Sequence, residues 1–294
     1  MVCVRSAWLV LGASTVLLED PTQGYFCTEL ALPLAEVRSV VDNRPDQTGV
    51  TDRTQYLAAR TVSATLWAAA GLGAVIDAVP GLFAPFMNPA ARPVLHYVLD
   101  RPGTPERTLT LRATGFDWPI AGPDERDILL QWVTADDPIS RDPNPKTVTA
   151  WSGSSTTPGR TYNLTFPRVY PASGGGPTTG SITNVGDVGI AALYRIYGPI
   201  TAPIVQVNLP GVTRYMRFNA TATIPAGQWI DIDTAARTIY WNSDPNSSAA
   251  TVFNWVSSQF PVVPPGQTAT MTLTGSSTSG VTQVQAIWND GYLT

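Results

Sequence analysis

Glycine and proline interrupt this chain so often that little room remains for long helices. Its 294 residues include 24 glycines and 26 prolines, whereas average proteins have about 7% glycine and about 5% proline. Frequent turn residues between short apolar runs are typical of chains built from many short strands. We therefore predict a mainly β fold.

The first half contains short segments in which apolar and polar residues alternate. In Arg60–Trp67, for example, apolar side chains alternate with threonine and serine, which is the period of a half-buried strand. We predict a loop at Asn43–Asp52 and one short helix around Ala74–Val79. The predicted strands are Val2–Leu11, Thr15–Leu18, Phe26–Leu34, Glu36–Val41, Arg60–Trp67, Val94–Asp100, Thr108–Phe116 and Ile128–Thr134.

The second half has a more regular pattern, with short strands at intervals of about ten residues, as in a β-sandwich. In its last strand Val284, Ala286 and Trp288 are expected to face the core, and Ile287 is the one apolar residue on the outer side. The predicted strands are Ile190–Tyr197, Ile204–Val207, Arg214–Ala222, Trp229–Ile232, Arg237–Trp241, Ala269–Leu273 and Val281–Trp288.

A stretch rich in serine, threonine, glycine and proline separates the two halves. It runs from about 151 to 179, although Thr161–Phe166 has the pattern of a further strand. Such composition marks loops and linkers. We therefore predict an N-terminal β domain, of barrel or sandwich type, over 1–165. A junction over 166–180 and a C-terminal β-sandwich over 181–294 follow.

The charge of the chain is low and slightly acidic. Charged residues make up 14% of the sequence and the net charge is −4, against an average charged content of about 25%. Nucleic-acid-binding surfaces need clustered lysine and arginine, so this class is not expected. Few charges also suggest that other subunits cover much of the surface.

The apolar run Leu66–Met87 is the strongest candidate for a membrane helix. A span needs about 20 apolar residues, but Gly71, Gly73, Pro80 and Pro85 interrupt this one. A short helix followed by an irregular segment is the better interpretation, so no membrane insertion is expected.

Residues for catalysis are scarce. His96 is the only histidine and lies in a strand-like run, which favours a packed structural role. Asp231 and Asp233 would share one face of a strand, as a glycosidase or calcium site requires. A strand end at which Asp233 bonds the backbone of the following turn is the favoured interpretation. Cys3 and Cys27 are too few for a zinc site or a disulfide framework. They are interpreted as free thiols, and a single disulfide between them is the alternative if their strands are adjacent. We predict no catalytic, metal or cofactor site.

Tryptophan leaves one binding function open. The chain has nine tryptophans, and sugars stack on exposed aromatic rings. Trp241 and Trp255, near a turn and a loop, are the best candidates for contact with a carbohydrate, although tryptophan more often packs in cores.

An ordered set of motifs in the second half resembles the C-terminal domain of the distal tail proteins of long-tailed, non-contractile bacteriophages. The resemblance covers about residues 180–294. More weakly, Gly49, Asp52, Tyr56 and Arg60 ahead of a strand resemble the N-terminal domain of that family. The C-terminal positions that carry the resemblance are Ile182, Asn184, Gly186, Gly198, Pro203, Gly227, Asp233 and Trp288.

The resemblance implies a structural protein of the virion tail tip, made in the host cytoplasm. In that family an N-terminal barrel-like domain builds a hexameric ring and a galectin-like sandwich lies outside it. The expected partners are further copies of the chain, the tail tube protein, the baseplate hub and the tape measure protein. DNA is expected to pass through the ring without specific binding. Lys146 is the only lysine, a bias typical of GC-rich genomes, which suggests a phage of a high-GC bacterium. The alternative is a peripheral minor tail protein whose sandwich binds a host carbohydrate or receptor.

Overall fold

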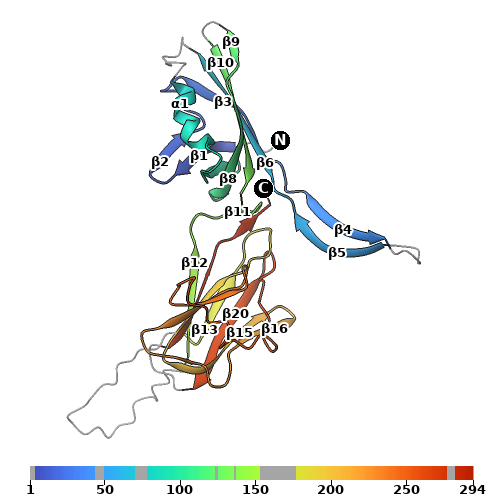
Figure 1. Cartoon of the computed structure of the whole chain (residues 1–294), viewed down its shortest axis with the longest axis vertical. Coiled ribbons are helices and arrows are strands. Elements are labelled where there is room, and N and C mark those ends of the chain that lie inside the picture. Colours follow the sequence, from blue (N-terminus) through green and yellow to red (C-terminus); the bar gives the residue numbers. More distant parts are fainter. Residues whose placement is uncertain are drawn as a thin grey trace, which may run out of the picture. The chain divides into compact units, whose positions relative to one another are not determined.

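The computed structural model describes residues 4–43, 50–69, 78–122, 125–135, 137–152, 177–276 and 282–293. The chain divides into two compact units (Figure 1). Unit 1 comprises Met1–Pro143 together with Gly291–Thr294, and unit 2 comprises Asn144–Asp290. The first unit thus ends before the expected boundary at 165, because the strand Lys146–Trp151 pairs with Gln283–Trp288 in unit 2. Most of the expected junction at 166–180, and the expected strand Thr161–Phe166, lie outside the described residues.

Unit 1 is built on a ten-stranded antiparallel sheet within the described part of the chain. Its strand order is β2-β1-β7-β8-β10-β6-β3; β11 joins β8 and β22, and β9 joins β10. The final residues of the chain therefore add a short strand to this unit. The strands are β1 (Val4–Leu11), β2 (Ser14–Leu17), β3 (Tyr25–Ala31), β6 (Thr61–Ala69), β7 (Val94–Leu99), β8 (Arg107–Asp117), β9 (Ile120–Gly122), β10 (Glu125–Thr134), β11 (Ser140–Arg141) and β22 (Gly291–Tyr292).

Buried and half-buried residues alternate along the strands of unit 1, as the sequence predicts, and the buried ones form its core. Leu95, Tyr97 and Leu99 of β7 are buried, and the residues between them are half-buried. A short helix, α1 (Val79–Phe83), and the 3₁₀ turn η2 (Ala84–Met87) cover the same core. The helix starts where the predicted one over Ala74–Val79 was expected to end; residues 70–77 are outside the described chain. None of the helices among the described residues is long and apolar enough to cross a membrane.

Two further strands of unit 1, β4 (Val37–Asn43) and β5 (Val50–Leu57), form a hairpin with its own two-stranded sheet. The predicted loop Asn43–Asp52 is shorter on its C-terminal side, since β5 begins at Val50. Residues 44–49 are outside the described chain.

Unit 2 is a β-sandwich. One sheet has the order β12-β21-β14-β18-β19, and the other has the order β13-β20-β15-β16 with β17 beside β15. Inward residues of both sheets form one apolar core, as in other sandwiches. The strands are β12 (Lys146–Trp151), β13 (Thr179–Thr183), β14 (Leu193–Tyr197), β15 (Ile200–Leu209), β16 (Val212–Arg217), β17 (Thr223–Ile224), β18 (Trp229–Asp233), β19 (Thr238–Trp241), β20 (Thr268–Ser276) and β21 (Gln283–Trp288).

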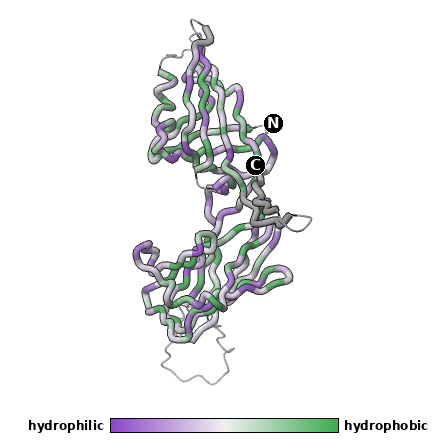
Figure 2. The backbone as a smooth tube through the Cα atoms, turned by 45° about the vertical axis from the view of Figure 1, so that its right-hand side comes forward, coloured by the Kyte–Doolittle hydropathy of each residue, from purple (hydrophilic) through white to green (hydrophobic). Residues whose placement is uncertain are grey.

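The predicted facing of the last long strand is confirmed. Val284, Ala286 and Trp288 are buried in the core, while Ile287 lies on the outer face and is only half-buried. In Figure 2 apolar and polar positions alternate along the strands of both units. The predicted mainly β fold class is confirmed.

Candidate functional site

The single histidine packs within unit 1. His96 Nδ1 lies 2.5 Å from Glu106 Oε1, and the imidazole stacks on Trp8 with ring centroids 5.4 Å apart. Both partners come from strands or turns next to β7. The ring is thus held by one carboxylate and one indole, which is the structural role that its strand position favours.

The two carboxylates of β18 share one face of the strand, as predicted, but each has its own partner. Asp231 is buried and accepts two hydrogen bonds from Arg195, at 2.7 Å from Nε and 2.9 Å from Nη2. This pairing raises the pKa of the Arg195 guanidinium above its usual range. Asp233 Oδ1 accepts from the backbone N–H groups of Ala235 and Ala236, each at 2.9 Å, in the turn that follows the strand. Both carboxylates are therefore engaged in holding the fold.

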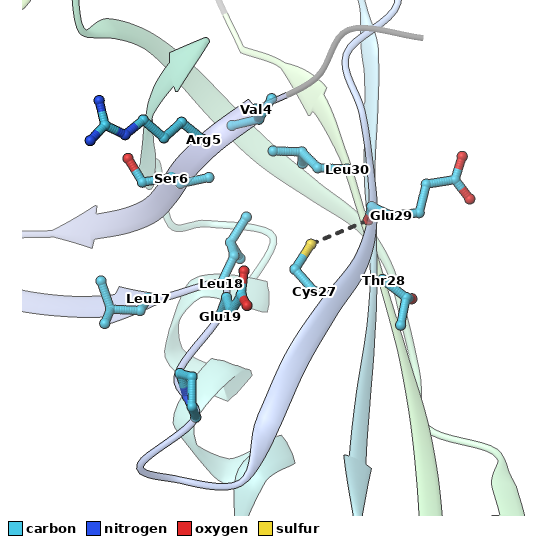
Figure 3. A pocket seen from close by; sticks show the side chains of 12 residues that line it. Val4, Arg5, Ser6, Leu17, Leu18, Glu19, Cys27, Thr28, Glu29 and Leu30 are labelled. Atoms are coloured by element: carbon cyan, nitrogen blue, oxygen red, sulfur yellow. Dashed lines mark hydrogen bonds between the residues drawn. The ribbon is translucent and has the colours of Figure 1, made fainter. Parts of the chain in front are cut away.

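A pocket of about 610 Å³ in unit 1 contains the Cys27 thiol (Figure 3). Burial, followed by the charges of Glu19 and Glu29, raises the pKa of this thiol to about 11, so it is protonated at neutral pH and is a poor nucleophile. Its sulfur donates to the Glu29 carbonyl at 3.4 Å. Cys3 is outside the described residues, among which no cluster of three or more histidine, cysteine or acidic residues could hold a metal ion.

The pocket lies between strand edges. One wall is the start of β1 (Val4–Ala7), the second is the end of β2 with Leu18, and the third is Cys27–Leu30 of β3. Within the described chain β6 is the only strand that pairs with β3, whose first residue Tyr25 also bridges Asp20. β2 pairs with β1 from Trp8 onward, and one further bond runs from Leu18 N to the Ala7 carbonyl. Backbone edges without a strand partner can accept a strand from another chain. This part of unit 1 is therefore a candidate assembly surface.

Arg60, one of the positions that resemble the N-terminal domain of the distal tail family, is an internal anchor. It is 2% exposed. Its Nε donates to the Pro33 carbonyl at 2.7 Å, and Nη1 donates to the Pro138 carbonyl and to Ser140 Oγ, each at 3.2 Å. Burial lowers the pKa of the guanidinium. One side chain thus ties three segments of unit 1 together.

In unit 2 three of the resemblance positions, Asn184, Gly186 and Trp288, meet at one buried turn. The Asn184 amide donates to the carbonyls of Val188 (2.8 Å) and Val263 (3.0 Å), and its oxygen accepts from Gly186 N at 2.9 Å. Trp288 Nε1 donates to the Thr183 carbonyl at 3.3 Å. Asn184 and Trp288 therefore fix the chain after β13.

The buried carboxylate of Asp290 holds the same turn. It accepts from Val185 N at 3.3 Å and forms an ion pair with Lys146 of β12. The sequence does not predict this pair, because Lys146 and Asp290 are 144 residues apart along the chain.

Other resemblance positions have backbone or packing roles. At Gly198 a Cβ would lie 2.2 Å from the Pro225 carbonyl oxygen, so only glycine fits. Gly227 has φ +78° in the turn before β18, a conformation that favours glycine. Pro203 accepts a backbone bond from Phe218, and Ile182 is buried in the core.

The two tryptophans expected to contact a carbohydrate differ in exposure. Trp241 is half-buried and packs against the core of unit 2. Trp255 is 47% exposed, but its ring contacts Phe253 and Phe260 with centroids 5.0 and 6.0 Å away, and its Nε1 donates to the Ala250 carbonyl at 3.0 Å. Only Trp255 leaves a large part of its ring open to a ligand.

Solved structures include the same fold. The chain is similar to the crystal structure of the Dit protein (gp 19.1) of phage SPP1, which is described as a paradigm of the hub adsorption apparatus in phages that infect Gram-positive bacteria. The TM-score is 0.61 at 9% identity, over 97% of this chain and 98% of that one.

The chain is also similar, at 10% identity, to the phage P2 baseplate in its activated conformation. The TM-score is 0.46 for the structure with calcium and 0.47 for the one with strontium, again over 97% of this chain and 98% of each other chain. No family model and no curated protein sequence matches. The likeness to SPP1 Dit spans both units, so the chain has the fold that its resemblance to distal tail proteins implied.

Proposed function

We propose that this protein is a structural component of a phage tail tip, a distal tail protein that joins the tail tube to the baseplate hub. One observation carries the proposal: the fold of SPP1 Dit is matched along 97% of the chain, through both units in the same order. The motif residues of unit 2 support it, since they hold the sandwich together.

The proposed mechanism is assembly into a ring, expected to be hexameric. Each subunit has backbone edges on which a neighbour can build, namely β3, the start of β1, and the separate β4–β5 hairpin. Head-to-tail contacts between such edges produce a closed ring when the rotation from each subunit to the next adds up to a full circle. The tail tube protein, the hub and the tape measure protein would contact the ring. A mildly acidic net charge would let DNA pass without being held at its phosphates.

Light scattering on the purified full chain, with negative-stain images of the same sample, tests this proposal. A ring of six has six times the 31.4 kDa subunit mass. A protein that remains monomeric alone, and also after incubation with tail tubes of its own phage, would contradict the proposal.

The second candidate is a peripheral minor tail protein whose sandwich binds a host-surface carbohydrate through Trp255 and Trp241. The half-exposed ring of Trp255 favours it. Loss of glycan binding in the Trp255→Ala and Trp241→Ala variants would support this function over ring assembly.

A further inference from the structure

The sheet β12-β21-β14-β18-β19 of unit 2 has one face in the core and one face directed outward. Residues paired across antiparallel strands point to the same side, so the register shows which residues share the outer face. Two adjacent rows cross it. The first row is Trp151–Gln283–Tyr197–Trp229, and the second is Thr149–Gln285–Arg195–Asp231–Tyr240.

The first row is aromatic. Trp151, Tyr197 and Trp229 are all half-buried, and they lie on β12, β14 and β18. Neighbouring strands are about 4.8 Å apart, so the four strands carry the row over roughly 14 Å. The rings of Tyr197 and Trp229 lie 6.1 Å apart at 44°. The row therefore offers ring surface over more than one position of an extended ligand.

Two side-chain amides, those of Gln283 and Gln285, lie beside these rings. Gln283 and Gln285 are half-buried, and their side chains make no hydrogen bond within the described chain. Each amide carries two N–H donors and a carbonyl acceptor. A ligand that covers this face must satisfy them, because buried polar groups without a partner are costly.

The one charged pair of the two rows is already neutralised. Besides its two bonds to Asp231, Arg195 donates to Ser243 Oγ at 2.9 Å, and Ser243 donates to Asp231 at 2.6 Å. Trp229 Nε1 also donates to Ser243 Oγ, at 3.1 Å, and the guanidinium carbon of Arg195 lies 5.5 Å from the centre of its ring. This network locks the indole in place, and the two rows present no unpaired charge.

We propose that this outer face, the rows from Trp151 to Trp229 and from Thr149 to Tyr240, binds a neutral polysaccharide. Sugar rings present apolar C–H faces that stack on aromatic rings, and hydroxyl groups that bond with side-chain amides. The neutral charge of the face favours an uncharged ligand over an anionic one. Trp255 is not among the residues of these two rows, and the proposal does not depend on ring formation.

Electrophoresis of the full chain in native gels containing soluble neutral polysaccharides (dextran, mannan, galactan or a β-glucan) tests the proposal. Gels with anionic polygalacturonate serve for comparison. The variants Trp229→Phe and Gln285→Ala test the face, and Trp255→Ala tests the other candidate site. Trp118→Ala, at an indole of unit 1 that is 48% exposed, is the control. Thermal melting of each variant checks its fold.

We expect retardation by at least one neutral polysaccharide, with binding at least tenfold weaker in Gln285→Ala and measurably weaker in Trp229→Phe. Trp118→Ala is expected to bind as the parent does. Absence of retardation by every neutral polysaccharide overturns the proposal, as does binding to polygalacturonate alone. Loss in Trp255→Ala with Gln285→Ala unaffected would place the ligand at Trp255 and also overturn it.

Discussion

Replacement of Asn184 by alanine should destabilise unit 2 through the loss of a single buried amide. Three partners lose their bond, namely the carbonyls of Val188 and Val263 and the N–H of Gly186, at 2.8–3.0 Å. Each intramolecular hydrogen bond contributes about 1 kcal/mol net, so the variant should lose about 3 kcal/mol of unfolding free energy. For a unit of this size that is a fall of roughly 6–12 °C in melting temperature.

Replacement of Asn184 by aspartate should cost more than alanine at neutral pH. The acid oxygen in place of Nδ2 would face the two carbonyl oxygens that now accept bonds, and Asn184 is fully buried. Burial raises the folded-state pKa of such a carboxyl above its unfolded value of about 3.9. The penalty from ionisation is therefore absent below that unfolded pKa, grows as the pH rises from the unfolded pKa to the folded one, and is fully present above the folded one.

Calorimetry of the full chain from pH 4 to pH 8 measures both effects. Asn246→Ala is the control, since Asn246 is exposed in a loop and should shift the transition by less than about 0.5 kcal/mol. The transition of unit 1 should not move. An Asn184→Asp variant as stable as the parent at pH 7, or one whose stability does not recover toward pH 4, would refute the assigned role of the amide.

Two further predictions concern a close backbone contact and the pocket thiol. Gly198→Ala places a Cβ against the backbone at 2.2 Å and should lower the unfolding free energy in urea by about 3 kcal/mol or more. Gly266→Ala, at φ +66° in open space, should cost only about 1 kcal/mol, and equal losses would contradict the packing argument. Because the pKa of Cys27 is about 11, its alkylation by iodoacetamide at pH 8 in a Cys3→Ser background should be roughly a hundredfold slower than that of a free thiol, and a titration midpoint near pH 8.5 would contradict the assigned environment.

The strands that the sequence predicts are those with one side in a core. β7 and β21 alternate clearly because one face of each is buried. The sequence pattern does not predict β5, since its polar run Thr51–Gln55 has no apolar alternation and β4 is its only strand partner among the described residues. A two-stranded ribbon can form without the periodicity that marks a half-buried strand.

The domain boundary shows how composition can mislead. The serine-, threonine- and glycine-rich composition of residues 151–179 predicts a loop, and this prediction places the domain junction there. Unit 2 begins earlier, at Asn144 in the turn-rich run Asp142–Pro145, because β12 belongs to its sheet. The partner of β12 lies more than 130 residues later in the chain, and a pairing over such a distance leaves no trace in local composition.

Local sequence spacing likewise predicts contacts between candidate residues on one strand, but not between residues on different strands. The spacing of two residues predicts Asp231 and Asp233 on one face of a strand, and the structure has them there. The ion pair of Asp231 depends on Arg195, which lies opposite it only because of the register between β14 and β18. The proposed glycan-binding face has the same origin. Trp151 and Trp229 come to lie in one row only after four strands are aligned. The position of Trp241 near a turn suggests a ligand contact, but its ring packs against the core. Surfaces assembled across a sheet are therefore defined by strand pairing, and single-chain motifs identify only the residues that hold the strands in place.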